Sequence, residues 1–130
     1  MRLYRSMKEA RDGSPVVGSS SRVLGVRPGS APTPDVLAAS PLDTVRPGEG
    51  GMSVVPDDPW HLPRHLRPSS LGGTGRDPVW YIETEDLGPD LAFRQDRPNH
   101  GLIEPQRDLT LQEFQDALAR TRSAWKLHCR

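Results

Sequence analysis

The chain has 130 residues, enough for one domain over residues 1–130, and its 17 basic and 17 acidic residues balance to zero net charge. This balance argues against DNA binding through bulk charge, and the short apolar runs argue against a membrane-spanning segment. The 14 prolines and 12 glycines, with only 34% hydrophobic residues, predict a core built from few short elements joined by long loops.

The N-terminal half predicts short strands separated by loops. Residues 1–5 form the first, with Leu3 and Arg5 on one face and Tyr4 on the other. The charged beginning of the chain has no apolar segment behind it, so it is not a secretory signal peptide and we expect a cytoplasmic protein. Residues 12–21 are rich in Gly and Ser and predict a partly disordered loop, and residues 23–26 predict a second strand.

Prolines limit which secondary-structure elements can form in the middle of the chain. Between residues 30 and 50 they forbid a long helix and leave room for one helical turn over residues 34–39. Residues 52–55 predict a strand that Pro56 closes. Residues 57–76 then form a long ordered loop, and loops of this length are uncommon unless they are functional.

The C-terminal half predicts three strands and a helix. Residues 79–82 are aromatic and β-branched, which favours a strand, and residues 91–94 and 101–103 are shorter candidates. A capping box at Thr110 and Glu113 begins the helix. We expect this sequence of elements to fold as an α+β domain around a small irregular sheet.

The predicted helix packs one side against the sheet. Leu111, Phe114, Leu118 and Trp125 fall on one stripe, so we expect the helix to end near Lys126. The single cysteine, Cys129, would then lie on a frayed tail, which excludes an internal disulfide and a cysteine-based metal cluster.

Two motifs suggest ligands but lack the required context. His61 and His65 have the spacing of a helical zinc pair, yet Pro63 between them opposes a regular helix, so we interpret them as solvated loop histidines and expect no metal site. The segment 72–76, GGTGR, resembles a phosphate-binding loop, but a proline and a strand follow it where such a loop needs a helix. A mobile loop beside a pocket remains an interpretation of this segment.

The segment 48–55, GEGGMSVV, has three glycines followed by a strand with Ser53 at its mouth. Glycines here let a ligand or another chain approach the backbone closely. An ordinary turn that needs positive φ is the other interpretation, and the segment alone leaves both open.

Three motifs in order carry a family resemblance: LYR at residues 3–5, GGMSV at residues 50–54, and DLGPDL at residues 86–91 followed by RQD at residues 94–96. Together the chain resembles the Tse-type toxins that bacterial type VI secretion exports. The resemblance implies a fold similar to mono-ADP-ribosyltransferases, with a split mixed or antiparallel sheet, a C-terminal helix, long loops and a cleft for NAD as substrate.

The resemblance also implies roles for particular residues. Arg5, with Tyr4 beside it, would grip the pyrophosphate of NAD, and Ser53 would brace the nicotinamide ribose. Gly50 and Gly51 would let the nicotinamide lie against bare backbone, and Tyr81 or Trp80 would stack on its ring. His100 would hydrogen-bond a ribose hydroxyl, and Glu104 would stabilise the oxocarbenium-like state. Glu104 departs from the transferase pattern because Leu102 stands where a partner acid is usual.

The function implied is that of an antibacterial toxin that binds NAD and either transfers ADP-ribose to a target-cell macromolecule or hydrolyses NAD. It would act in the target cytoplasm, and a cognate immunity protein would cover its cleft. A different interpretation is a non-catalytic interaction protein whose Pro-rich segment 56–68 docks a partner. Neutral charge disfavours an RNA-directed nuclease.

Overall fold

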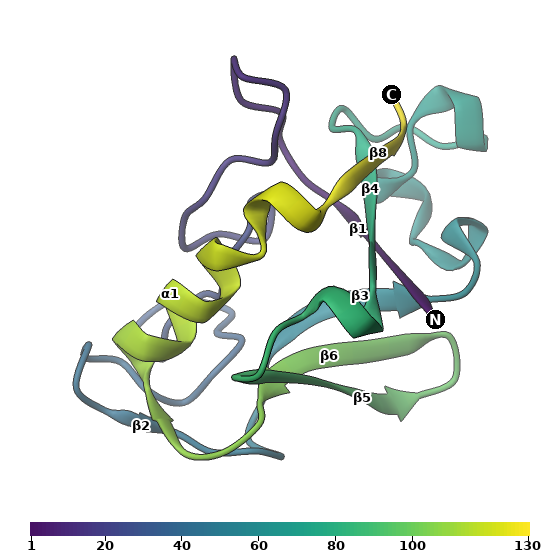
Figure 1. The fold of residues 1–130 in the computed structure, drawn as a ribbon. Helices are drawn as coiled ribbons and strands as arrows, with labels where there is room; N and C mark the ends of the chain where they lie inside the picture. The colour runs from purple at the N-terminus through teal and green to yellow at the C-terminus, as the bar shows by residue number, and fades with distance from the viewer.

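The computed structural model describes residues 1–130 as an antiparallel β-sheet with one α-helix beside it (Figure 1), which confirms the α+β prediction. The strands of the sheet follow the order β5-β6-β3-β1-β4-β8. Their bounds are β1 (Arg2–Ser6), β3 (Met52–Pro56), β4 (Val79–Glu83), β5 (Leu91–Arg97), β6 (His100–Pro105) and β8 (Lys126–Cys129). A second small ladder pairs β2 (Thr44–Val45) with β7 (Leu109–Thr110), next to helix α1 (Leu111–Arg120). None of the helices has the length and apolar character to cross a membrane.

The sheet divides into two halves at the junction of β1 and β3. Strand β1 pairs with β4 at five positions, whereas it pairs with β3 only at Leu3↔Pro56 and Tyr4↔Val55. One half is β5-β6-β3 and the other is β1-β4-β8, and in Figure 1 the two halves run in clearly different directions. Every ladder is antiparallel, so the predicted split sheet is antiparallel rather than mixed.

Alternation along the strands separates two hydrophobic clusters on the two faces of the sheet. Leu3 belongs to the larger cluster, which includes Phe114 and Leu118 of α1. Tyr4 points to the other face and packs with Leu62 of the loop that follows β3. The prediction that Leu3 and Tyr4 face opposite sides is therefore confirmed.

The helix begins as predicted and ends earlier. Thr110 and Glu113 form the capping box in both directions. After Arg120 the hydroxyl of Thr121 donates to the carbonyl oxygen of Leu118 at 2.6 Å and accepts from Trp125 Nε1 at 3.0 Å, and these bonds hold the indole in the core beyond the helix. The prediction that the helix ends near Lys126 is therefore wrong.

The last residues form a strand that was not predicted. Strand β8 pairs with β4 at the edge of the sheet, and Cys129 lies opposite Val79 rather than on a frayed tail. Its four residues are too few for their alternation to stand out beside the helical pattern that precedes them.

Several loops also differ from expectation. Residues 23–26 form no strand and make only an isolated bridge between Val17 and Leu24, and residues 34–39 contain no helical turn. Asp12 accepts two 2.7 Å bonds from Arg122, so the loop 12–21 is tied to the body of the molecule rather than partly disordered. The ordered loop 57–76 is confirmed: it contains three 3-10 helices, η1 (Pro59–His61), η2 (Arg64–Leu66) and η3 (Ser69–Leu71).

Candidate functional site

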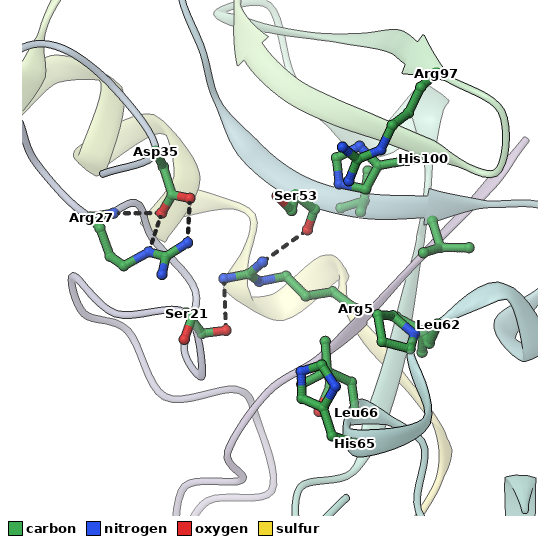
Figure 2. A pocket seen from close by; sticks show the side chains of 14 residues that line it. Arg5, Ser21, Arg27, Asp35, Ser53, Leu62, His65, Leu66, Arg97 and His100 are labelled. Carbon is green, nitrogen blue, oxygen red and sulfur yellow. Dashed lines mark hydrogen bonds and ion pairs between the residues drawn. The ribbon is translucent and has the colours of Figure 1, made fainter. Parts of the chain in front are cut away.

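A cavity of about 320 Å³ opens where the two halves of the sheet separate (Figure 2). This volume lies at the small end of the range for small-molecule sites, about 300–1,000 Å³. Five segments that are distant in sequence supply its walls. The lining residues are Arg5, Ser6, Ser21, Arg27, Asp35, Ser53, Val54, Val55, Leu62, Pro63, His65, Leu66, Arg97 and His100.

Arg5 is a buried cation in the wall of this cavity. Its side chain comes from β1 and the residue is only 7% exposed. The guanidinium donates to the carbonyl oxygens of Ser53 at 2.8 Å, Val23 at 2.9 Å and Ser21 at 3.3 Å, and no carboxylate pairs with it. Burial lowers the pKa of Arg5 to about 10, so the group stays charged at neutral pH. Three carbonyl oxygens accept from the guanidinium, the Asp35 carboxylate stabilises its charge at longer range, and an anion in the cavity would complete its neutralisation.

A second arginine lies across the cavity and is fully paired. Arg27 Nη2 is 2.9 Å from Asp35 Oδ1 and Arg27 Nε is 3.1 Å from Asp35 Oδ2, while the backbone N–H of Arg27 donates to the same carboxylate at 2.7 Å. The Asp35 hydrogen bond raises the pKa of Arg27. Asp35 is the only acidic residue in the lining, so it anchors the loop 27–35 and is not available as a base.

The turn between β5 and β6 brings Arg97 and His100 to the same cavity. The two residues are paired across the hairpin, and Asn99 in the turn between them has φ of 60°. His100 Nδ1 lies 2.6 Å from Asp96 Oδ1. In the view of Figure 2 the side chains of Arg97 and His100 overlap, and both line the cavity. With neutral histidines the lining therefore contains three arginines against one aspartate.

The Ser53 hydroxyl is the only polar side-chain group that β3 contributes to the lining of the cavity. Its carbonyl oxygen accepts from Arg5, whereas its hydroxyl has no hydrogen-bond partner within the protein. A hydroxyl without an internal partner can donate to or accept from a bound molecule without breaking an existing bond.

The structure brings together Arg5, Ser53 and His100 and places the predicted aromatic residues elsewhere. Tyr4 and Tyr81 lie on the face of β1 and β4 opposite to Arg5, with ring centroids 6.1 Å apart, and Tyr4 belongs to the same hydrophobic cluster as the lining residues Val55 and Leu62. Trp80 is 1% exposed in the core, and its Nε1 donates to the carbonyl oxygen of Met7 at 2.9 Å. None of these three aromatic residues lines the cavity: Trp80 shares the face of Arg5 but is packed into the core, whereas Tyr4 and Tyr81 point to the other face of β1 and β4.

Gly50 and Gly51 also lie outside the cavity. A Cβ at Gly51 would stand 2.4 Å from the carbonyl oxygen of Ile103, and one at Gly50 would stand 2.2 Å from that of Asp35. Gly50 also has φ of +106°. The glycines therefore permit close approach of the protein's own backbone, and the predicted floor under a nicotinamide is not formed there.

Glu104 is the last predicted residue that the structure places apart from the cavity. It is 8% exposed, and its Oε2 accepts from the N–H of Gly48 at 2.7 Å and from Nε of Arg94 at 3.0 Å. These bonds join the glycine turn to β5 and β6, and they direct the carboxylate away from Arg5, Ser53 and His100.

Among the lining residues that were not predicted as part of a site, four carry charged or imidazole side chains. They are Arg27, Asp35, His65 and Arg97. The sequence offers one signal for them, since Arg27 and Asp35 enclose a Pro- and Gly-rich loop that an ion pair can close. His65 is exposed, as expected of a solvated loop histidine, and it also lines the cavity together with Leu66. No group of three or more His, Cys, Asp or Glu side chains is placed to hold a metal ion.

Comparison with known families matches residues 2–125 of this chain to the family described as Tse2 ADP-ribosyltransferase toxin. No curated protein and no solved structure matches the chain. The match covers all the strands and loops that line the cavity, and it includes α1.

Proposed function

This chain belongs to the Tse2 ADP-ribosyltransferase toxin family, and from that premise we propose that its cavity binds NAD and that the protein transfers ADP-ribose to a macromolecule of the target cell. The observation that carries the proposal is the Arg5 guanidinium, buried in the cavity wall without a carboxylate partner. The pyrophosphate of NAD is an anion that suits such a site, because guanidinium groups bind phosphate oxygens through charge-assisted hydrogen bonds.

We assign each part of this substrate to a part of the lining. Arg5 and Arg97 face the phosphates, and the unpartnered hydroxyl of Ser53 is available to the nicotinamide ribose. Because the cavity measures about 320 Å³, we assign to it the nicotinamide riboside and the adjacent phosphate, with the adenosine extending outward.

The Pro-rich loop supports this function over a purely docking role. Leu62, Pro63, His65 and Leu66 form one wall of the cavity, so the loop 57–76 is part of the site rather than an independent appendage. Family membership further supports export by type VI secretion, action in the cytoplasm of the target cell, and a cognate immunity protein that covers the cavity.

Growth inhibition and NAD calorimetry test the proposal together. Expression of the wild-type chain in bacterial cytoplasm is expected to stop growth, and Ser53→Ala is expected to restore it while keeping the circular dichroism spectrum. Ser69→Ala, at an exposed position of the 3-10 helix η3, is the matched control and should remain toxic. Harmless wild-type protein that also gives no heat with NAD would refute the proposal.

A further inference from the structure

We infer that Asp96 and His100 form a base that removes the proton of an O–H group, so that the acceptor of ADP-ribose is a hydroxyl group. This inference rests on the proposed function, because it concerns NAD bound in the cavity lined by Arg5, Ser53 and His100. It names the chemical class of the second substrate, which the family description leaves open.

The geometry fixes which ring nitrogen carries the proton. Asp96 Oδ1 lies 2.6 Å from His100 Nδ1, and the side chains are 25% and 19% exposed. Burial acts to raise the pKa of Asp96, but the hydrogen bond and the charge of His100 together with the charge of Arg97 lower it overall. Asp96 is therefore a carboxylate, which can only accept, so Nδ1 donates to it, and in the neutral form of the ring Nε2 carries the lone pair.

The other groups in the lining do not provide a base of this kind. Asp35 already accepts three hydrogen bonds from Arg27. His65 lines the cavity without a carboxylate to orient its ring, and Glu104 lies outside the cavity. His100 is thus the one lining residue that combines an available lone pair with an orienting carboxylate.

Charge and acidity select the acceptor class. The three arginines in the lining disfavour a cationic acceptor such as a guanidinium or an ammonium group. A thiol of ordinary pKa, about 8.5, loses its proton without much help, and a carboxylate has no proton to lose. An alcohol hydroxyl keeps its proton at neutral pH and gains most from an oriented base.

The step balances without another reactant. The bond between C1′ of the ribose and the nicotinamide nitrogen breaks, and its electron pair stays on that nitrogen, so neutral nicotinamide leaves. The acceptor oxygen forms a bond to C1′, and its proton passes to Nε2 of His100 and later to solvent. His100 is the catalytic residue of this step and Asp96 is the positioning residue.

Purified protein with NAD and small surrogate acceptors tests the inference. We expect mass spectrometry to find ADP-ribose transferred to glycerol or to water, and none on agmatine or N-acetylcysteine. We expect Asp96→Asn and His100→Ala to lower kcat on the order of 10²-fold, a typical effect of losing a general base. The Kd for NAD, measured by calorimetry, should change less than about twofold, since neither variant removes Arg5.

Two further experiments distinguish a loss of catalysis from a loss of folding. Added imidazole should restore part of the kcat of His100→Ala and none of that of Asp96→Asn. Asp86→Asn and His61→Ala replace exposed residues outside the cavity and should keep wild-type kcat. Faster transfer to agmatine or N-acetylcysteine, a full rate in Asp96→Asn, or no turnover by protein that binds NAD would overturn the inference. Wild-type protein that does not bind NAD would instead remove the proposed function on which it rests.

Discussion

The guanidinium of Arg5 donates a 2.8 Å hydrogen bond to the carbonyl oxygen of Ser53 at the point where β1 and β3 stop pairing. The ladder between these strands ends at Tyr4↔Val55, so the next residues of the two strands diverge. The divergence opens the cavity, and the Arg5 side chain spans the gap that the missing backbone bonds leave. One residue therefore both joins the two halves of the sheet and gives the cavity its charge.

Arg5→Lys is expected to lower both stability and NAD affinity. A lysine ammonium lacks the planar fork, so it cannot satisfy the carbonyl oxygens of Ser21, Val23 and Ser53 together. Leaving one of them unpaired should reduce the free energy of unfolding by about 1–3 kcal/mol, measured by urea denaturation. Arg64→Lys, at an exposed position without an ion pair, is the control and should leave the urea midpoint unchanged. An unchanged midpoint in Arg5→Lys would contradict the bridging role.

Gly51→Ala is expected to destabilise the fold more than Gly48→Ala. A Cβ at Gly51 meets the carbonyl oxygen of Ile103 at 2.4 Å, so β3 and β6 must move apart, at a cost of about 1–3 kcal/mol. Gly48 has φ of +85° with open space around it, and alanine there should cost only about 1 kcal/mol of backbone strain. Thermal unfolding of both variants compares the two effects. Equal loss in the two variants would show that close packing against β6 is not the reason for Gly51.

Glu104→Gln is expected to reduce stability without reducing NAD affinity. The substitution removes the charge that Arg94 contacts and keeps one oxygen for the N–H of Gly48. We expect a loss of about 1–2 kcal/mol in the free energy of unfolding. Calorimetry with NAD and urea denaturation on the same sample provide the two measurements. Loss of turnover at unchanged stability would instead support the oxocarbenium-stabilising role that the family resemblance implies.

Acid is expected to weaken the fold through carboxylates whose pKa values the native contacts lower. The hydrogen bond from Arg122 lowers the pKa of Asp12, and the hydrogen bond from Arg107 lowers that of Asp90, from an ordinary value of 3.8. The unfolded chain therefore binds more protons, so this stabilisation is complete above the unfolded pKa and is lost as pH falls through the folded pKa. Urea midpoints between about pH 5 and pH 2 measure the loss.

Asp12→Asn provides the matched control for the acid effect. This variant should be less stable than wild type at neutral pH, and its midpoint should fall less steeply on acidification, because one titrating contact is already absent. A wild-type midpoint that rises as the solution is acidified would contradict the sign of the argument.

The sequence predicted elements that depend on local patterns. The strand at residues 79–82 is aromatic and β-branched, and the helix beginning at Thr110 has a complete capping box, so neighbouring residues alone determine them. The prediction of a strand at residues 23–26 was wrong for the opposite reason. Its apolar residues are buried, yet the chain there makes hydrogen bonds to the Arg5 guanidinium and to Gln115 rather than to a strand.

The site was predictable only in part for a similar reason. Family motifs indicated Arg5, Ser53 and His100, and the structure gathers these side chains around one cavity. His65 and Arg97 reach the same cavity through the turns of a Pro-rich loop and of a hairpin, and no local pattern fixes such positions. Tyr4 and Tyr81 were assigned through the family resemblance, whereas alternation along the strand decides which face a side chain occupies.

The arrangement of the sheet has a consequence for the time at which the protein becomes active. Strand β1 sits between β3 and β4, and the hairpin that supplies Arg97 and His100 comes from the last third of the chain. A growing polypeptide on the ribosome therefore lacks half of the sheet and these two side chains until synthesis is well advanced. Folds that depend on such distant pairings also form slowly, in about milliseconds to seconds. A newly made molecule thus passes through an interval in which the cavity is not yet complete.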